Sequence, residues 1–142
     1  MDDTTHARRG RMLLIEDNPA DVELMSAALE DVGARIDLVA CLSGDEALAL
    51  LHGTREAQQH LPDLIVLDLN LNGLHGHDVL RALKSDATTR AIPIVVCSSS
   101  QAAQDIGESY ARGANAYISK CMHFNEMRDA VRLLVRYWFG AA

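Results

Sequence analysis

Three acidic residues come directly after short apolar runs of the chain. Glu16 and Asp17 follow residues 12–15, and Asp68 follows residues 64–67. An uninterrupted apolar run is typical of a strand buried on both faces of a parallel sheet, and open α/β folds bind their ligands at the carboxyl ends of such strands. We therefore expect these carboxylates to meet at one edge of a sheet.

Two further apolar runs end in side chains that suit the same chemistry. Ser98 follows residues 94–97, and Lys120 follows residues 116–119. A lysine ammonium is a compact positive charge that can contact a phosphoryl oxygen, and a hydroxyl can donate a hydrogen bond to one. Together, the strand ends indicate a site that handles a phosphoryl group.

Carboxylates that lie within a few ångströms repel one another unless a cation offsets their charge or one of them takes a proton. Mg²⁺ is the natural cation here, because it prefers oxygen ligands and is usually bound by one or two carboxylates together with a phosphate. Asp68, central among these charges, is the candidate nucleophile for an acyl phosphate. The remaining groups would act by positioning and charge neutralisation.

Taken one at a time, these residues have simpler interpretations. Asp17 could stabilise the start of a helix through the helix dipole. Asp68 could be an ordinary acid at the start of a loop, and Lys120 and Ser98 could be ordinary polar residues at the surface. Only their joint occurrence at the ends of different strands favours a phosphoryl site.

The elements that must position these residues alternate along the chain. Apolar runs are separated by longer segments with a 3.6-residue period, which is typical of repeated βα units and a parallel sheet. We predict strands at residues 12–15, 36–40, 63–68, 92–97 and 116–119. We predict helices at residues 19–32, 43–51, 77–85, 102–112 and 125–138. This count predicts a single-domain α/β fold, a flavodoxin-like (βα)5 doubly wound parallel sheet with strand order 2-1-3-4-5.

Capping residues mark several helix boundaries. Asn18 followed by Pro19 predicts a helix start, because asparagine caps the first turn and proline fits the first helical position. Gly33 predicts the end of that helix. Residues 43–46 form a capping box that opens the next one.

Composition limits the classes of function. The chain has 142 residues and a net charge of −7, which argues against a nucleic acid as partner. No apolar stretch is long enough to span a membrane or to serve as an export signal. The cysteines, Cys41, Cys97 and Cys121, are odd in number and lack a metal-ligand spacing, so we expect reduced thiols and a cytoplasmic protein.

Four stretches in the same order and spacing carry a family resemblance, namely residues 13–18, 64–70, 92–98 and 113–120. With them the chain resembles the receiver domains of bacterial two-component response regulators. The resemblance covers residues 11–138, which leaves residues 1–10 as a flexible N-terminal tail and residues 139–142 as a C-terminal tail.

The resemblance implies that Asp68 accepts a phosphoryl group from a histidine of a sensor kinase. The protein would then be a phosphoacceptor that assists its own phosphoryl transfer and dephosphorylation rather than an enzyme. It further implies a set of Mg²⁺ ligands: Asp17, Asp68 and the backbone carbonyl of Asn70, with Glu16 bound directly or through water. By the same resemblance Lys120 contacts the phosphate, while Ser98 is the switch hydroxyl and Tyr117 the switch aromatic.

A narrower resemblance is to the small single-domain regulators that accompany bacterial phytochrome kinases. It rests on residues 18–22, 68–71 and 99–101 and on the aromatic C-terminal helix. It implies a phytochrome histidine kinase as the partner.

Two loops depart from the family pattern. Asn72 stands where members often have proline, which predicts a more flexible loop that presents Asn70 less firmly. Cys121 follows Lys120 where members usually have proline after a cis bond. A cis bond costs about 2.5 to 4 kcal/mol before a non-proline residue, against about 0.5 to 1 kcal/mol before proline. We expect the Lys120–Cys121 bond to be trans, or else a visibly strained cis bond.

The last predicted helix carries more apolar residues than one core face needs. The residues at core spacing are Phe124, Met127, Val131, Leu134, Val135 and Trp138. Leu133, Tyr137 and Phe139 remain outside that stripe. Surplus apolar residues often mark an interface, so we expect a homodimer through this helix and tail and a signal passed by protein contact. Alternatively, Tyr137 and Phe139 fold back over the domain.

Two other functions fit parts of the pattern. A phosphohydrolase of the haloacid-dehalogenase type also uses a strand-end aspartate with Mg²⁺, but its second acid would stand at position 70. Asn70 occupies that position, and an amide cannot supply the proton. An unphosphorylated receiver-like scaffold would show no Mg²⁺-dependent labelling, although every side chain that the reaction needs is present.

Overall fold

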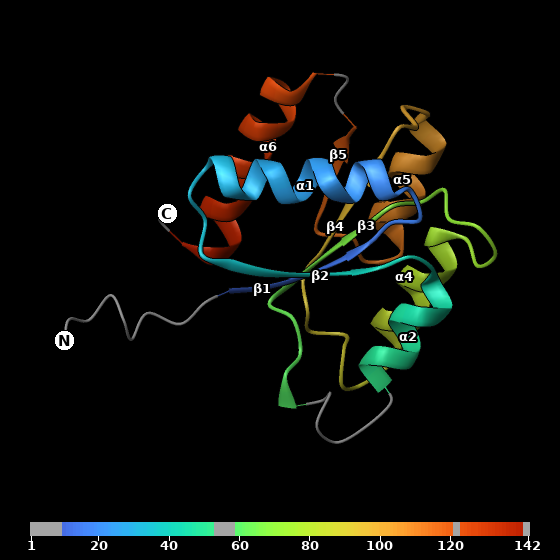
Figure 1. Ribbon diagram of the computed structural model, residues 1–142. Coiled ribbons are helices and arrows are strands. Elements are labelled where there is room, and N and C mark those ends of the chain that lie inside the picture. Colours follow the sequence, from blue (N-terminus) through green and yellow to red (C-terminus); the bar gives the residue numbers. More distant parts are fainter. Residues whose placement is uncertain (1–9, 53–58, 121–122, 141–142) are drawn as a thin grey trace.

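The computed structural model describes residues 10–52, 59–120 and 123–140 (Figure 1). Its strands are β1 (Gly10–Ile15), β2 (Ile36–Cys41), β3 (Leu64–Leu67), β4 (Ile94–Ser98) and β5 (Ala116–Ser119). Its helices are α1 (Pro19–Asp31), α2 (Gly44–His52), α4 (Gly76–Ser85), α5 (Ala103–Ala111) and α6 (Phe124–Phe139). None of the helices in these ranges is long and apolar enough to span a membrane. The tail boundaries at residues 10 and 139 stay a prediction.

The strands form one parallel sheet in the order β2-β1-β3-β4-β5, which confirms the predicted flavodoxin-like topology. Every residue of β3 is buried, because helices cover both faces of the sheet. This is why the strand is apolar throughout instead of alternating. Ile15 pairs with Leu67, so β1 and β3 end side by side.

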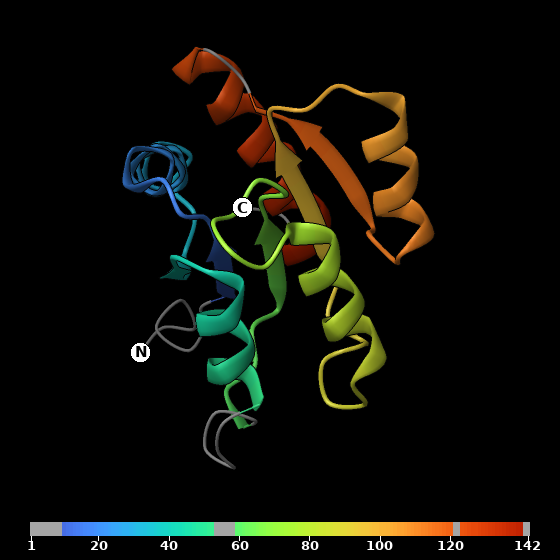
Figure 2. The same cartoon turned by 90° about the vertical axis from the view of Figure 1, so that its right-hand side faces the viewer.

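Side chains alternate between two core layers on opposite faces of the sheet. Leu13 and Ile15 face the layer formed with α2 and α4, whereas Met12 and Leu14 face the layer formed with α1 and α6. Figure 2 shows these helix groups on either side of the strands. The apolar layers cover both faces of the sheet. Polar side chains are therefore placed at its carboxyl edge, where the strands end.

Helix boundaries follow the capping residues. The Asn18 side chain accepts a hydrogen bond from the backbone N–H of Ala20, with Pro19 at the first position of α1. Gly33 takes the left-handed conformation after α1, with φ of 71°. At α2 the backbone N–H of Glu46 donates to Ser43 Oγ, as in a capping box.

Some predicted boundaries were wrong by one or two residues. The β4 strand begins at Ile94 rather than at Ile92, because the Ile92 N–H bonds to Thr89 in a turn and Pro93 has no N–H for the ladder. The α4 helix begins at Gly76 rather than at His77, since the His75 side chain caps it.

Candidate functional site

The three acids that follow β1 and β3 come together at the carboxyl edge of the sheet. Glu16, Asp17 and Asp68 each offer a carboxylate oxygen, and these oxygens lie within 4.8 Å of one another. Glu16 is 3% exposed and Asp68 is 4% exposed, while Asp17 is half-buried. The predicted meeting of the carboxylates is confirmed, and their roles stay predictions.

Backbone hydrogen bonds explain why the first and third acids reach this position. The N–H of Asp68 donates to the carbonyl of Ile15, and the N–H of Glu16 donates to the carbonyl of Cys41. Each acid therefore continues the hydrogen-bonding ladder of its strand by one residue. The side chains are carried past the end of the apolar layers while their backbone remains part of the sheet.

Three further amides orient the carboxylates themselves. The N–H of Asn18 donates to Glu16 Oε2 over 3.2 Å, and the N–H of Asn70 donates to Asp68 Oδ1 over 3.2 Å. The N–H of Asn72 donates to Asp17 Oδ2 over 3.0 Å. A proline at position 72 would have no N–H to donate. The altered residue in this loop therefore links the β3–α4 loop to the acid after β1.

Gly76 lets α4 begin close to the site. Its N–H donates to the carbonyl of Leu69 over 3.0 Å. A Cβ atom at this position would lie 2.5 Å from Leu69 Cα and 2.6 Å from the carbonyl oxygen of Asp68. Only glycine fits this approach without moving backbone next to Asp68.

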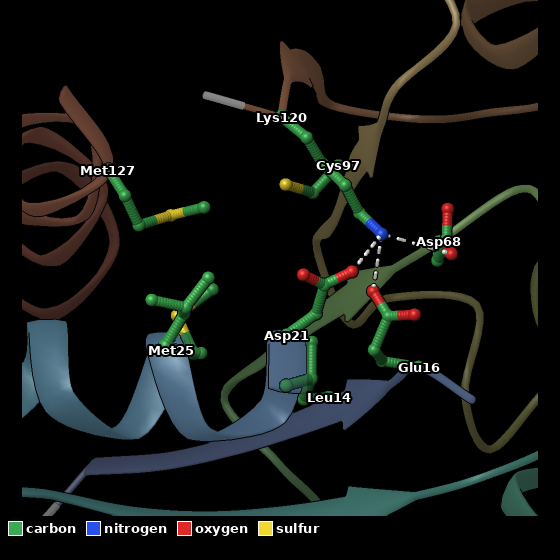
Figure 3. Close-up of a pocket in the computed structure, with 9 residues that line it drawn as sticks. Leu14, Glu16, Asp21, Met25, Asp68, Cys97, Lys120 and Met127 are labelled. Atoms are coloured by element: carbon green, nitrogen blue, oxygen red, sulfur yellow. Dashed lines mark hydrogen bonds and ion pairs between the residues drawn. The ribbon is translucent and has the colours of Figure 1, made fainter. Parts of the chain in front are cut away.

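Lys120 enters the site from the end of β5, where its N–H donates to the carbonyl of Ser98. Its Nζ lies 2.8 Å from Glu16 Oε1 and 3.3 Å from Asp68 Oδ2. A third oxygen, Asp21 Oδ2 in the first turn of α1, lies 2.7 Å away (Figure 3). Sequence reasoning placed Lys120 in the site and missed Asp21. The only signal was an acid at the start of a helix, where the helix dipole is the usual explanation.

The charges perturb one another strongly. Burial raises the pKa of Glu16 to about 7, against the lowering effect of Lys120 and with a further contribution from Asp68. For Lys120, burial would lower the pKa, but hydrogen bonds to Asp21 and Glu16 and the charge of Asp68 outweigh it and raise the pKa. One lysine thus compensates only part of the negative charge.

This unbalanced charge fits a divalent cation. Glu16, Asp17 and Asp68 supply hard oxygen ligands, the kind that Mg²⁺ requires, and the half-buried Asp17 leaves the group open on one side. Within the described ranges no other group of acids, histidines or cysteines is so placed. The structure does not test the carbonyl of Asn70 as a further ligand.

The two predicted switch residues meet at one loop. Ser98 is fully buried at the end of β4, and its Oγ accepts a hydrogen bond from the N–H of Ser100. Tyr117 is half-buried, and its hydroxyl donates to the carbonyl of Ser100 over 2.7 Å. Both side chains are therefore hydrogen-bonded to the backbone of Ser100. Their switch roles stay predictions.

The predicted interface residues of α6 divide into two groups. Leu133 is 65% exposed and Tyr137 is 77% exposed. Phe139 is half-buried and packs on the core layer of α1 and α6, where a side chain on Gly10 would overlap its ring. Phe124 was wrongly assigned to the core: it is 36% exposed, because it is the first residue of α6 and precedes the part that packs on the sheet.

The Lys120–Cys121 peptide bond lies outside the described residues, so the expectation about its geometry stays a prediction.

Comparison with known proteins finds relatives that match nearly the whole chain. The family model described as the response regulator receiver domain matches residues 12–132. The probable methanogenesis regulatory protein FilR2 of Methanothrix harundinacea is 33% identical over 129 residues, which cover 91% of this chain and 83% of that protein. Response regulator Rcp1 of Synechocystis sp. is 30% identical over 128 residues, which cover 89% of this chain and 87% of that protein.

Solved structures agree with the sequence matches. The phosphorylated cyanobacterial phytochrome response regulator RcpA superposes with a TM-score of 0.86 at 36% identity and covers 95% of this chain and 97% of its own. The Mn²⁺-bound form of Rcp1 superposes with a TM-score of 0.82 at 29% identity, with 94% and 96% covered.

Proposed function

Since this chain belongs to the response regulator receiver family, whose members are phosphoacceptors in two-component signalling, we propose that Asp68 is the residue that receives the phosphoryl group. The observation that supports this most is the position of Asp68: a buried carboxylate, grouped with two other acids and 3.3 Å from the ammonium of Lys120. Asp68 belongs to the acidic group and also contacts the ammonium of Lys120.

In the proposed reaction, a carboxylate oxygen of Asp68 attacks the phosphorus of a phosphohistidine. The new P–O bond forms as the P–N bond breaks, and the electron pair of that bond stays on the imidazole nitrogen. Receiver domains bind Mg²⁺ or Mn²⁺ at an acidic pocket. Mg²⁺, held here by Glu16, Asp17 and Asp68, would neutralise charge on the attacking and phosphoryl oxygens.

Lys120 and Ser98 would complete the site around the phosphoryl group. The ammonium of Lys120 already lies beside Asp68 and can contact one phosphoryl oxygen. The Ser98 hydroxyl is a donor at the neighbouring strand end, and it would have to turn away from Ser100 to bond a phosphoryl oxygen. Tyr117 shares Ser100 with it, so phosphorylation would alter the surroundings of Tyr117.

The test is labelling with acetyl phosphate and Mg²⁺, followed by mass spectrometry of the intact protein. The wild type should gain an adduct of about 80 Da, the mass of one phosphoryl group, and Asp68→Asn should gain none. The control is Asp45→Asn, which removes an exposed acid from the first turn of α2 and should leave labelling unchanged. Labelling that persists in Asp68→Asn would refute the assignment, and an unlabelled wild type would favour the scaffold.

We propose a phytochrome histidine kinase as the donor and the cytoplasm as the compartment. The similarity to RcpA and Rcp1 over nearly the whole chain supports the former, and the free thiol of Cys41 is consistent with the latter. Transfer should then be fast from a phytochrome kinase and slow from an unrelated histidine kinase. Equal rates from both would refute the proposed pairing.

We also propose that the chain forms a homodimer through Leu133 and Tyr137. Their exposure on α6 supports this, and a chain ending at Arg136 retains Leu133 but lacks Tyr137 and the tail. Sedimentation should show weaker dimerisation of that truncated chain. Unchanged dimerisation would exclude the tail from the interface.

A further inference from the structure

Asp21 is a charged residue of the site, and neither the packing of the fold nor the acidic group explains its position there. It occupies the first turn of α1, and its carboxylate lies 2.7 Å from Lys120 Nζ. An acid that served only the helix dipole would have no need of a partner 99 residues away, and here the side chain is only 29% exposed. Asp21 therefore interacts specifically with Lys120.

Asp21 differs from the other two partners of the lysine. Glu16 and Asp68 belong to the acidic group that suits a cation, whereas Asp21 does not belong to it. A bound Mg²⁺ would offset the negative charge of Glu16 and Asp68 and so weaken their interactions with Lys120. The ion pair between Asp21 and Lys120 would remain. Figure 3 shows Asp21 and Asp68 approaching the ammonium from different directions.

A phosphoryl group on Asp68 would need the same ammonium. Lys120 has three N–H donors, and the oxygens of Asp21, Glu16 and Asp68 already take up its hydrogen-bonding capacity. Of these three contacts, the hydrogen bond to Asp21 is the shortest, at 2.7 Å. Any new contact between Lys120 and a phosphoryl oxygen must weaken this bond or share the ammonium with it.

We propose that Asp21 is a positioning residue that holds Lys120 on the α1 side of the site and competes with the phosphoryl group for its ammonium. This inference rests on the proposed phosphorylation of Asp68. Asp21 thereby weakens the interaction of Lys120 with the phosphoryl group. It also links the start of α1 to the site residues that follow β3 and β5. Loss of its charge releases the lysine toward the phosphoryl oxygens and removes a nearby negative charge.

The test measures binding of beryllofluoride, an analogue of the phosphoryl group, in the presence of Mg²⁺, by ¹⁹F NMR at constant ionic strength. Asp21→Asn should bind it about tenfold more tightly than the wild type, because one charge is removed within a few ångströms of the anion. Asp21→Glu keeps the charge and should stay within about twofold of the wild type. Glu23→Gln removes an exposed acid from the same helix and should do likewise.

A second measurement reports on the lysine directly. In the Mg²⁺-loaded wild type, the ¹H–¹⁵N signal of the Lys120 ammonium should be sharp, because Asp21 protects it from exchange with water. The signal should broaden in Asp21→Asn and persist in Asp21→Glu. A purely structural role for Asp21 would not produce this pattern, and thermal unfolding of each variant confirms that it is folded.

The outcomes separate the two proposals. A wild type that binds no beryllofluoride, or binds it as well after Asp68→Asn, contradicts the proposed function itself. If Asp68 is required but Asp21→Asn binds like Glu23→Gln, or more weakly than the wild type, the competition is wrong while the proposed function stands. Tighter binding by Asp21→Glu, equal to that of Asp21→Asn, also refutes it, since charge would not then be the cause.

Discussion

The carboxyl edge of the sheet buries charged residues that are usually exposed, whereas the outer face of α6 exposes apolar residues that are usually buried. At the edge, Glu16 and Asp68 are charged residues with 3% and 4% exposure. On α6, Leu133 and Tyr137 are apolar or aromatic residues with 65% and 77% exposure. Acids are almost never fully buried unless they are paired. Exposed apolar residues mark an interface when they form part of a patch.

The difference shows what each region requires. The acidic edge obtains part of its compensation within the chain, from Lys120 and from backbone amides, and its remaining charge suits a small cation and a phosphoryl group. The α6 face cannot be compensated by an ion, because its unfavourable feature is apolar surface in water. Changes at the edge should therefore alter stability and chemistry, whereas changes on α6 should alter association.

The largest effect is expected from Lys120→Met. Removing the ammonium leaves buried carboxylates without their cation, which should lower the free energy of unfolding by about 3 kcal/mol in urea titrations without Mg²⁺. Added Mg²⁺ should restore part of this loss, because it offsets the same charges. A loss that is identical with and without Mg²⁺ would mean that the lysine stabilises the fold through packing alone.

The second effect concerns pH. The pKa of Glu16 is about 7 in the folded protein and near 4.5 in an unfolded chain, so the folded state binds the extra proton between these values. Its stabilising contribution is complete below about pH 4.5 and is lost as the pH rises through 7, at a cost of about 3.5 kcal/mol, since the two pKa values differ by about 2.5 and one pKa unit corresponds to about 1.4 kcal/mol.

Thermal unfolding between pH 5 and 8 without Mg²⁺ would measure this loss, and Glu16→Gln should flatten the profile. Stabilisation by Mg²⁺ should grow over the same range, because the metal requires the ionised carboxylate. A wild-type profile that matches that of Glu16→Gln would contradict the raised pKa.

A third comparison uses two glycines. Gly76→Ala should destabilise the protein by about 2 kcal/mol and slow labelling of Asp68, because the new Cβ would meet backbone atoms of Leu69 and Asp68. Gly107→Ala, in α5, meets nothing within 4 Å and should stabilise by about 0.5 to 1 kcal/mol with labelling unchanged. Equal effects of both changes in urea unfolding would show that the close approach at Gly76 is unimportant.

The smallest effect on stability is expected on α6. Replacing both Leu133 and Tyr137 by serine should change the free energy of unfolding by no more than about 0.5 kcal/mol per residue, as for other surface positions. Sedimentation equilibrium should nevertheless show a shift toward monomer. Leu50→Ser, at a 45% exposed position on α2, serves as the control and should leave the association unchanged.

Much of the fold could be predicted because local patterns and burial agree. The run at residues 64–67 is apolar throughout, since β3 is buried on both faces, and Asn18 with Pro19 marked the start of α1 correctly. Phe124 was placed in the core because periodicity gives the face of a helix but not where the helix extends past the sheet. Periodicity likewise could not show that Phe139 folds onto Gly10.

The sequence by itself determined the order of the strands' apolar runs, and with it which residues stand at the carboxyl edge: Glu16, Asp17, Asp68, Ser98 and Lys120. These follow from position directly after a strand. Only the tertiary structure decided that Asp21 shares Lys120 and that the Asn72 amide holds Asp17. Both contacts join segments more than 50 residues apart through side-chain reach and loop geometry. Neither contact leaves a periodic or local signal in the chain.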